Sequence, residues 1–318
     1  MTMTNSITAL ILTFNEEQHI GRCIRSLQGV AERICIVDSF STDRTVDIAR
    51  SMRAEVLQNP WKNYATQFQY GLDQFDIHSS WTMRIDADEY LEPGLQEALR
   101  EWFANPQPGV NALYLRRKIV FLGRPILHGF FYPAMMLRIW RTGEGRIEQR
   151  WMDEHIVLDA PVTATLQGDL VDHNLNDLTW WIGKHNGYAT REVYDMVEIL
   201  ERNRAAKDAG MAAMKGQAAR KRFLKEKVYA RLPATMRASL YFLYRYVLGR
   251  GFLDGKAGFF FHFLQAYWYR TLVEAKLYEL QMRADAAGLR PYDLLTREGV
   301  FSGPLPPAAF TEPTRPET

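Results

Sequence analysis

Short apolar runs rich in β-branched residues alternate with longer amphipathic segments over the first hundred residues of the chain. The runs are residues 7–14 (ITALILTF), 33–40 (RICIVDSF), 81–88 (WTMRIDAD) and, more weakly, 54–58 (AEVLQ). The segments between them repeat their apolar positions with helical spacing and are residues 16–28, 43–52 and 61–75. This alternation of strands and helices predicts a parallel sheet with helices on both faces.

Polar residues close three of these runs, and ligands of such sheets bind beyond the carboxyl ends of the strands. The candidates are Thr13, Asn15 and Glu16 after the first run, Asp38, Ser39 and Ser41 after the second, and Asp86, Asp88 and Glu89 after the fourth. A structural interpretation is also open for some of them. Ser41 or Thr42 before Asp43 is typical of a helix N-cap, and Glu16 suits a first helical turn because it opposes the helix dipole.

Three carboxylates fall within four positions at Asp86, Asp88 and Glu89. Like charges so close resist ionising together, so the cluster either forms a solvated turn or binds a cation. Asp38 is expected on the same edge of the sheet, and no lysine or arginine follows in the next turn. We therefore favour a divalent cation.

The bulk composition is that of an ordinary globular protein. The 318 residues are 47% hydrophobic and 24% charged, and the net charge of +2 gives no reason to expect nucleic-acid binding. Two cysteines, Cys23 and Cys35, make neither a disulfide framework nor a metal knuckle and fit a reducing compartment. The first 17 residues lack a basic segment before their apolar stretch, so we expect no signal peptide and a cytoplasmic location.

Three motifs carry a resemblance to a known family. They are residues 9–27 (ALILTFNEEQHIGRCIRSL), 37–49 (VDSFSTDRTVDIA) and 84–93 (RIDADEYLEP). In this order they resemble the nucleotide-binding half of the family 2 glycosyltransferases, above all bacterial enzymes of lipopolysaccharide core, capsule and exopolysaccharide synthesis. The resemblance covers roughly residues 7–200. It implies an α/β GT-A fold, a Rossmann-like mixed sheet flanked by helices, with a C-terminal mainly helical extension.

The resemblance also implies roles for individual residues. Thr13, Asn15 and Asp38 would hold the nucleoside of a sugar nucleotide, and Asp86 would lie near the ribose. Asp88, the second acid of the DxD motif, would bind a Mg²⁺ or Mn²⁺ ion on the diphosphate, because charge growing on the leaving oxygen needs a preorganised cation. The full set of expected donor-binding residues is Thr13, Asn15, Glu16, Asp38, Ser41, Arg84, Asp86, Lys184 and Arg191.

The segment MDEHI supplies candidates for a general base. Inverting transfer needs a base that takes the proton of the acceptor hydroxyl, and a carboxylate in a partly dry pocket suits this role. By resemblance Glu154 occupies that position. Asp153 is the alternative base, and a structural ion pair is the third possibility. Which of Arg116, Arg117, Arg124 and His128 contacts the acceptor stays open.

Further basic groups follow in residues 168–193. His173 comes after an apolar strand pattern and is a candidate third metal ligand beside Asp88 and Asp86, although a lone histidine is often structural. Lys184 and Arg191 lie two turns apart on a predicted helix, so both could face the diphosphate. A solvated helix face is the alternative.

From about residue 215 the chain becomes basic, aromatic and helical in period. Charged residues interrupt every apolar run before it reaches the roughly 20 residues of a spanning helix. The composition fits helices in the interface of an anionic membrane, with an ordinary packed helical subdomain as the alternative. We expect a GT-A domain over residues 1–200, with a donor half of about 1–105 and an acceptor half of about 106–200. A membrane-interface region over 201–300 and a disordered tail over 301–318 complete the predicted domains.

The expected activity is metal-dependent inverting transfer of a sugar from a nucleotide sugar, UDP-hexose in particular, to a lipid-linked or lipopolysaccharide acceptor. The site of action would be the cytoplasmic face of the bacterial inner membrane. The alternatives are a nucleotidyltransferase that makes sugar nucleotides and a catalytically silent scaffold of a polysaccharide assembly complex. The sequence names neither the sugar nor the oligomeric state. The absence of a G-x-x-x-x-G-K-[ST] motif argues against a P-loop.

Overall fold

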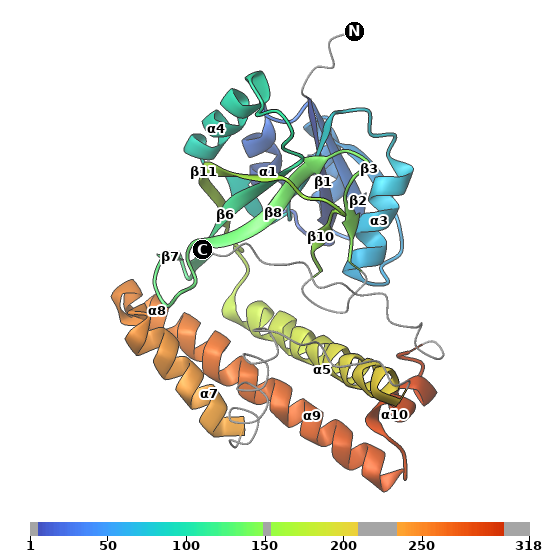
Figure 1. Ribbon diagram of the computed structural model, residues 1–318. Coiled ribbons are helices and arrows are strands. Elements are labelled where there is room, and N and C mark those ends of the chain that lie inside the picture. Colours follow the sequence, from blue (N-terminus) through green and yellow to red (C-terminus); the bar gives the residue numbers. More distant parts are fainter. Residues whose placement is uncertain (1–5, 149–153, 209–233, 302–318) are drawn as a thin grey trace. The chain divides into compact units, whose positions relative to one another are not determined.

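The computed structural model describes residues 6–148, 154–208 and 234–301 (Figure 1). Contacts divide the chain into two compact units, Met1–Asp177 with Gly249–Phe259, and Leu178–Leu248 with Phe260–Thr318. The predicted boundary at residue 200 differs from this division. It falls inside a single helix, α5 (Leu178–Asp208), which belongs to the second unit as a whole.

The first unit is built on a mixed sheet. In spatial order its strands are β3 (Glu55–Gln58), β2 (Arg33–Asp38), β1 (Ile7–Thr13), β4 (Trp81–Arg84), β8 (Ala134–Arg141), β6 (Ala112–Phe121), β11 (Thr163–Asp172) and β5 (Glu89–Leu91), and β7 (Arg124–Ile126) pairs with β6. Strands β3, β2, β1 and β4 are parallel. Strand β8 is antiparallel to both β4 and β6, and β11 is parallel to β6. The carboxyl ends of β1, β2, β4, β6 and β11 therefore meet at one edge.

Helices cover both faces of this sheet (Figure 1). They are α1 (Ile20–Leu27), α2 (Thr45–Ser51), α3 (Tyr64–Gln74) and α4 (Pro93–Ala104). Side chains of α1, α2 and α4 pack into one apolar core with alternate residues of β1, and α3 packs into a second core on the other face. The four predicted strands and the three predicted helices of the first hundred residues are confirmed.

Two glycines allow close packing around the sheet. A Cβ atom at Gly71 of α3 would lie 2.8 Å from the side chain of Val37, so only glycine lets this helix approach β2 so closely. Gly168 has φ +91° at an irregularity in β11, and a Cβ atom there would lie 2.4 Å from the backbone nitrogen of Leu95. The start of α4 therefore rests directly on the β11 backbone.

The fourth apolar run ends earlier than its sequence suggests. Strand β4 stops at Arg84, and β5 starts at Glu89, so Asp86 and Asp88 lie in the connection between two strands. A separate two-stranded sheet pairs β9 (Arg146–Ile147) with β10 (Ile156–Val157). Its residues Ile147 and Ile156 pack into the same core as α3.

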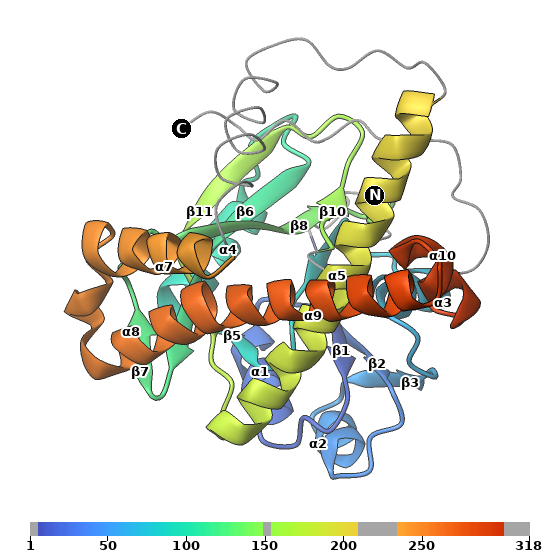
Figure 2. The ribbon, with the colours of Figure 1, turned by 90° about the horizontal axis from the view of Figure 1, so that it is seen from below.

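The second unit is helical. Its elements are α5, α7 (Ala234–Leu243), η2 (Tyr244–Leu248), η4 (Phe263–Trp268), α9 (Tyr269–Ala286) and α10 (Pro291–Arg297), and α8 (Gly255–His262) joins the two units along the chain. Helices α5 and α9 cross each other (Figure 2). The predicted helical extension is confirmed. Within the described chain, none of the helices has the length and apolar character needed to cross a membrane.

Candidate active site

Asp38 forms the centre of one side of the site, where β1 and β2 end next to each other. Its carboxylate is fully buried and accepts a hydrogen bond from Thr13 Oγ1 at 2.9 Å. The Ser41 backbone N–H donates to it at 2.9 Å, the Ser41 hydroxyl donates as well, and Gln58 Nε2 donates at 3.1 Å. Neutral donors therefore hold this carboxylate in place.

The loops after β1 and β2 are tied together by reciprocal hydrogen bonds. The Asn15 backbone N–H donates to Ser41 Oγ at 2.9 Å, and the Asn15 side-chain oxygen accepts from the Thr42 backbone N–H at 2.8 Å. Asn15 adopts φ +55°, a left-handed conformation that asparagine tolerates better than most residues. The Glu16 backbone N–H donates to Thr45 Oγ1 at 2.7 Å.

The capping interpretations of this region are not confirmed. The N-cap of α2 is Arg44, which makes no side-chain capping bond, although the nearby Asp43 accepts from the Thr45 backbone N–H at 2.9 Å. Ser41 does not cap this helix, because its hydroxyl contacts Asp38 and the Asn15 backbone instead. The Glu16 carboxylate does not lie in the first turn of α1, which starts at Ile20.

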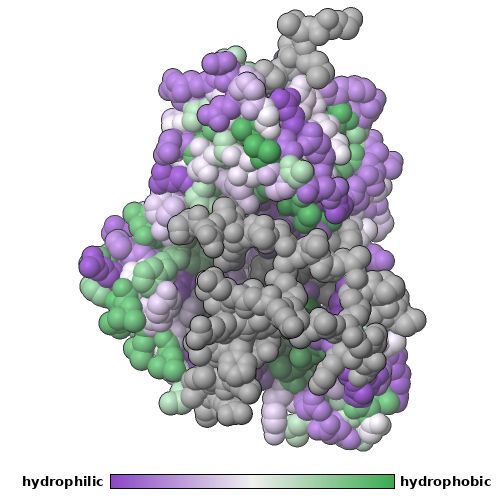
Figure 3. Space-filling model, in the orientation of Figure 1, coloured by the Kyte–Doolittle hydropathy of each residue, from purple (hydrophilic) through white to green (hydrophobic). Residues whose placement is uncertain are grey.

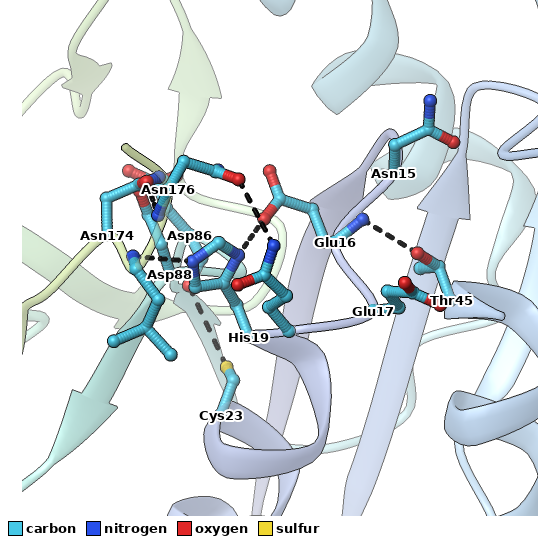
Figure 4. Close-up of polar contacts among 12 residues, drawn as sticks. Asn15, Glu16, Glu17, His19, Cys23, Thr45, Asp86, Asp88, Asn174 and Asn176 are labelled. Atoms are coloured by element: carbon cyan, nitrogen blue, oxygen red, sulfur yellow. Dashed lines mark hydrogen bonds and ion pairs between the residues drawn. The ribbon is translucent and has the colours of Figure 1, made fainter. Parts of the chain in front are cut away.

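Glu16 positions a buried histidine. Its carboxylate lies 2.6 Å from Nδ1 of His19, and Nε2 of the same ring accepts a hydrogen bond from the Leu175 backbone N–H at 2.8 Å. Figure 4 shows the imidazole between Glu16 and the chain segment of Asn174 and Asn176. His19 thus joins the β1 loop to the segment that follows β11.

The three carboxylates after β4 have three different environments. Glu89 is 1% exposed, Asp86 keeps 29% of its side chain exposed, and Asp88 is half-buried. Arg138 from β8 lies 2.6 Å from Glu89 and 3.3 Å from Asp86. Arg138, which comes from a distant part of the sequence, therefore neutralises much of the negative charge of this cluster. The prediction considered only basic residues in the next turn and so overestimated this charge.

Asp86 is held by aromatic and basic side chains. The Tyr64 hydroxyl donates to it at 2.7 Å, and the Arg84 guanidinium, which stacks over the Tyr64 ring at 4.3 Å, lies 3.8 Å from it. Burial among these groups opposes ionisation, but Arg138 and Arg84 outweigh it and lower the pKa of the Asp86 carboxyl. Asp86 is therefore a fixed negative charge at neutral pH.

Glu89 behaves in the opposite way. Burial raises the pKa of Glu89 to about 7, and the neighbouring charge of Asp86 adds to the effect although Arg138 acts against it. One carboxylate oxygen accepts from the Asp86 backbone N–H at 2.9 Å, which fixes the turn that carries Asp86. Glu89 therefore stabilises the turn that carries Asp86, and its buried carboxylate is not exposed to a ligand.

Asp88 lies beside the segment that follows β11. Its carboxylate accepts from Asn174 Nδ2 at 3.0 Å, and its backbone oxygen accepts from the His173 N–H at 3.2 Å. The Arg22 guanidinium donates to the backbone oxygens of both Asp88 and His173. The structure therefore brings together two of the expected metal ligands, Asp88 and His173.

The donor set at Asp88 fits a cation that is shared with a substrate. Among the residues that the structure describes, no group of three or more His, Cys, Asp or Glu side chains is arranged to hold a metal ion. Mg²⁺, however, is commonly held by one or two carboxylates together with substrate phosphates and water. Asp88 fits this pattern, while the charge of Asp86 is already balanced by two arginines.

His173 is less readily available to a metal. Burial lowers the pKa of its imidazole, and the nearby Arg22 lowers it further, so the ring is neutral at pH 7. Arg22 Nη1 lies 3.3 Å from His173 Nδ1. When Nδ1 accepts a hydrogen bond from Arg22, the single ring proton is on Nε2. A metal ion can bind Nε2 only if this proton moves to Nδ1, and the contact between Nδ1 and Arg22 is then lost.

Arg84 connects Glu154, the expected base, to Asp86. Arg84 Nη1 donates to the backbone oxygen of Glu154 at 2.8 Å, so one guanidinium joins the β4 end to the segment before β10. The Glu148 backbone N–H donates to the His155 oxygen at 2.9 Å, which closes the β9–β10 pair. Asp153, the alternative base, lies outside the described residues.

Lys184 and Arg191 belong to α5 in the second unit. Both lie against aromatic rings of their own helix. Lys184 Nζ is 4.6 Å from the centre of the Trp180 ring, and the Arg191 guanidinium is 4.9 Å from that of Tyr188. A role for either in donor binding stays a prediction.

Several residues of the site were missed from sequence. Tyr64 and Arg138 contact Asp86, and Arg22 and Asn174 contact Asp88 or its backbone. Arg138 left one signal, since it interrupts the strand pattern AMMLRIWR with a basic residue at a position that packs inward. The other three sit in ordinary helix or loop patterns that gave no such signal.

Comparison with known proteins decides the family. The model of "Glycosyl transferase family 2" matches residues 8–173. The chain belongs to this family. The predicted GT-A fold and the resemblance to enzymes of lipopolysaccharide synthesis are thereby confirmed.

Two curated relatives of this family 2 glycosyltransferase show how far the similarity extends. The chain is 33% identical over 210 residues to the lipopolysaccharide core biosynthesis glycosyltransferase LpsC of Rhizobium meliloti. The matched region covers 62% of this chain and 74% of the relative. The chain is also 39% identical over 103 residues to an uncharacterized glycosyltransferase of Rickettsia bellii, and this match covers 32% of this chain and 34% of the relative. The chain thus spans about three quarters of the first relative and a third of the second.

A solved structure also matches the family 2 glycosyltransferase, over a shorter stretch. It is glucosyl-3-phosphoglycerate synthase from Mycobacterium tuberculosis in complex with Mn²⁺, UDP and glucosyl-3-phosphoglycerate, at 19% identity and a TM-score of 0.30. The match covers 36% of this chain and 44% of that one. A TM-score this low supports no inference about the site.

Proposed function

We propose that this family 2 glycosyltransferase is metal-dependent and inverting, and that it moves a hexose from a UDP-sugar to a lipid-linked saccharide during synthesis of a bacterial surface polysaccharide. The observation that carries the proposal is a continuous hydrogen-bonded edge of the sheet. It runs from Asp38 through the β1 loop, Glu16 and His19 to the segment whose Asn174 holds Asp88.

This edge offers two kinds of group suited to the two ends of a sugar nucleotide. Asn15 presents an exposed amide group, which suits the hydrogen-bonding edge of a base and the ribose hydroxyls, and the buried Asp38 holds the Ser41 loop beside it. Asp88 presents a half-buried carboxylate that fits a divalent cation. Bound there with the diphosphate, Mg²⁺ or Mn²⁺ would stabilise the negative charge of the leaving nucleoside diphosphate.

The residues of the chain would supply positioning and proton transfer. Arg84 lies beside the Asp86 carboxylate and donates to the Glu154 backbone oxygen, which supports a position for Glu154 near the donor site. In inverting transfer Glu154 would accept the proton of the acceptor hydroxyl as that oxygen attacks the anomeric carbon. Asp153 is the alternative for this role.

The acceptor and the location are inferred from the relative and from composition. Similarity to a lipopolysaccharide core glycosyltransferase supports an acceptor held in a membrane, at the cytoplasmic face of the inner membrane. The basic stretch around residues 215–225, which we expect to contact anionic lipid, lies outside the described residues. Family membership favours sugar transfer over nucleotidyl transfer.

The test is a screen of nucleotide sugars for slow hydrolysis with and without Mn²⁺ or Mg²⁺, combined with thermal shifts in UDP. We expect Asp88→Asn to abolish transfer and to weaken UDP binding chiefly when the metal is present. Asp47→Asn, which removes an exposed carboxylate from α2, is the matched control and should behave as wild type.

Three results would contradict the proposal. Full activity of the wild type in excess chelator, or an Asp88→Asn variant with unchanged activity, would remove the metal from the mechanism. A wild-type protein that hydrolyses no nucleotide sugar and whose melting temperature responds to no nucleoside diphosphate would instead be the silent scaffold.

A further inference from the structure

The hairpin between β6 and β7 ends in a turn whose residues are unusual. Phe121 pairs with Arg124, so the loop consists of Leu122 and Gly123 alone, with φ values of +48° and +73°. Two-residue turns with both φ values positive favour Asn-Gly, because a bulky side chain is strained in this conformation. Leu122 nevertheless occupies the first position, and 56% of it is exposed. Local folding preferences therefore do not explain a leucine there.

The same combination recurs eight residues later in the chain. Phe130 follows Gly129 in the loop between β7 and β8, has φ +56° and is 64% exposed. A large aromatic residue in the left-handed region is rare for the same steric reason. Backbone strain of this kind is concentrated at functional surfaces.

A third segment brings more apolar surface to this hairpin. The short helix η3 (Gly251–Asp254) contacts β7, and its Asp254 carboxylate accepts from the backbone N–H groups of Leu127 and His128 at 3.2 and 3.0 Å. Asp254 also lies 2.5 Å from His128 Nδ1. These bonds hold η3 against the loop after β7.

Together these segments form one exposed apolar surface, which we call the β7 surface. It consists of Leu122, Leu127, Phe130, Phe252 and Leu253, which are 40–64% exposed. Figure 3 shows hydrophobic residues at the left of the view, in the region where Figure 1 labels β7 and α8. Apolar residues grouped in this way mark an interaction site.

The charges around the β7 surface indicate its partner. Arg124, Arg250 and Lys256 are exposed, whereas the segments 120–133 and 249–259 contain one acidic residue, Asp254. The Asp254 side chain is only 3% exposed because it faces His128. The exposed arginine and lysine side chains of these two segments thus accompany the apolar residues without an exposed carboxylate from the same segments, which matches the headgroup region of an anionic bilayer. A two-fold contact with a second copy would bring these like charges together.

We propose that the β7 surface docks this enzyme onto anionic membranes, with Leu122 and Phe130 entering the interface and the neighbouring arginine and lysine side chains contacting lipid headgroups. The inference rests on the proposed function in one respect, since a membrane-held acceptor gives docking its purpose. It assigns the docking to a surface of the sheet unit itself. The extended β6–β7 hairpin would then hold the carboxyl edge of the sheet next to the bilayer.

The test uses substitutions that remove the apolar side chains without disturbing the turns. Asparagine is favoured in left-handed conformations, so Leu122→Asn with Phe130→Asn should leave the melting temperature unchanged or raise it. We expect the wild type to float with phosphatidylcholine vesicles that contain phosphatidylglycerol, and the double variant to bind them at least about 10-fold more weakly. Arg124→Glu should also weaken binding, more so at low salt.

The matched control is Val162→Asn, which changes a 54% exposed apolar residue at the amino end of β11, the opposite edge of the sheet. It should bind vesicles as the wild type does. Donor hydrolysis, measured without vesicles, should be the same in the wild type, the Leu122→Asn/Phe130→Asn variant and Val162→Asn, so that a failure of docking is distinguished from a failure of the proposed activity.

Three outcomes would overturn the proposal. The wild type could stay unbound with anionic vesicles at low salt, or the double variant could bind as tightly as the wild type. In the third, sedimentation would show a dimer of the wild type that the double variant loses while vesicle binding persists, which would make the β7 surface an interface between two copies.

Discussion

Asp38 and Glu89 are both buried carboxylates at strand ends of the same sheet, 0% and 1% exposed, but the protein holds them by different means. Asp38 accepts from hydroxyl, amide and backbone N–H donors at positions 13, 41 and 58. Glu89 lies against the guanidinium of Arg138, which is 49 positions away in sequence and itself 1% exposed. One side of the site is therefore held by several neutral bonds and the other by a buried ion pair.

This difference predicts how each side responds to the loss of a partner. A neutral hydrogen bond contributes about 1 kcal/mol, and a carboxylate with several donors keeps the rest when one is removed. Breaking a buried ion pair leaves an uncompensated charge and costs about 3–5 kcal/mol. The Asp38 side should lose stability in small steps, whereas the Glu89 side should depend mainly on Arg138, with Arg117 as a more distant second guanidinium at 3.4 Å.

The largest expected effect follows from removing Arg138. Arg138→Met keeps a long side chain in the same space but removes the nearer of the two guanidinium groups beside Glu89 and leaves only Arg117, at 3.4 Å. We therefore expect a loss toward the lower end of about 3–5 kcal/mol in the free energy of unfolding. Urea titration at pH 8 measures it. Arg141→Met, on the same strand with its guanidinium stacked over the Trp81 ring at 4.3 Å, is the control and should cost less than half as much.

The effect of Arg138→Met should depend on pH with a definite sign. Burial raises the pKa of Glu89 to about 7 from an ordinary 4.5, so between these values the folded protein binds a proton that the unfolded chain releases. Glu89 therefore makes stability fall as the pH rises through this window. Removing Arg138 raises this pKa further, so the loss should be greatest above pH 7 and shrink toward pH 5. A loss that is equal at pH 5 and pH 8 would contradict the ion-pair interpretation.

The same contrast explains how much could be predicted from the sequence. The parallel strands, the helices between them and the polar strand ends were predictable because each depends on a local pattern, and Thr13 and Asp38 are indeed direct partners. The partners of Asp86 and Glu89 were not, because Arg138 and Tyr64 reach them only through the pairing of β8 and the packing of α3. Local patterns carry no information on such contacts.

The domain boundary failed for a related reason. The family motifs end near His173, but no composition change marks the point where the sheet unit gives way to α5 at Leu178. The sequence also contained no sign that Gly249–Phe259 packs with the sheet unit. The hydrogen bonds of Asp254 and of the Gly249 backbone oxygen to the loop after β7 reveal it.

The next largest expected effect concerns Glu154, whose backbone Arg84 contacts, and it should change catalysis without changing stability. Glu154→Gln keeps the shape of the side chain but cannot accept a proton, so kcat should fall by roughly 10²-fold or more. Donor affinity and the melting temperature should stay near wild type, because glutamine has the size of glutamate and leaves the hydrogen bond from Arg84 to the Glu154 backbone in place. Steady-state kinetics and UDP titration measure both.

Asp153→Asn is the matched variant for this experiment. It should keep kcat within a few-fold of wild type if Glu154 is the base. Loss of turnover in Asp153→Asn with normal turnover in Glu154→Gln would instead assign the base to Asp153. Loss of donor affinity in Glu154→Gln would show a binding role.

The smallest expected effect tests the side that neutral donors hold. Thr13→Val removes one hydroxyl that donates to Asp38 and changes almost no volume, while the Ser41 and Gln58 donors remain. We therefore expect a loss of about 1 kcal/mol in the free energy of unfolding. Thr82→Val is the control, since Thr82 is equally buried but bonds to the Thr142 hydroxyl at 2.8 Å, far from any carboxylate of the site. Both variants should lose similar amounts in urea titration. A loss at Thr13 of 3 kcal/mol or more, the size expected for a broken buried ion pair, would mean that the Asp38 side also depends mainly on one partner.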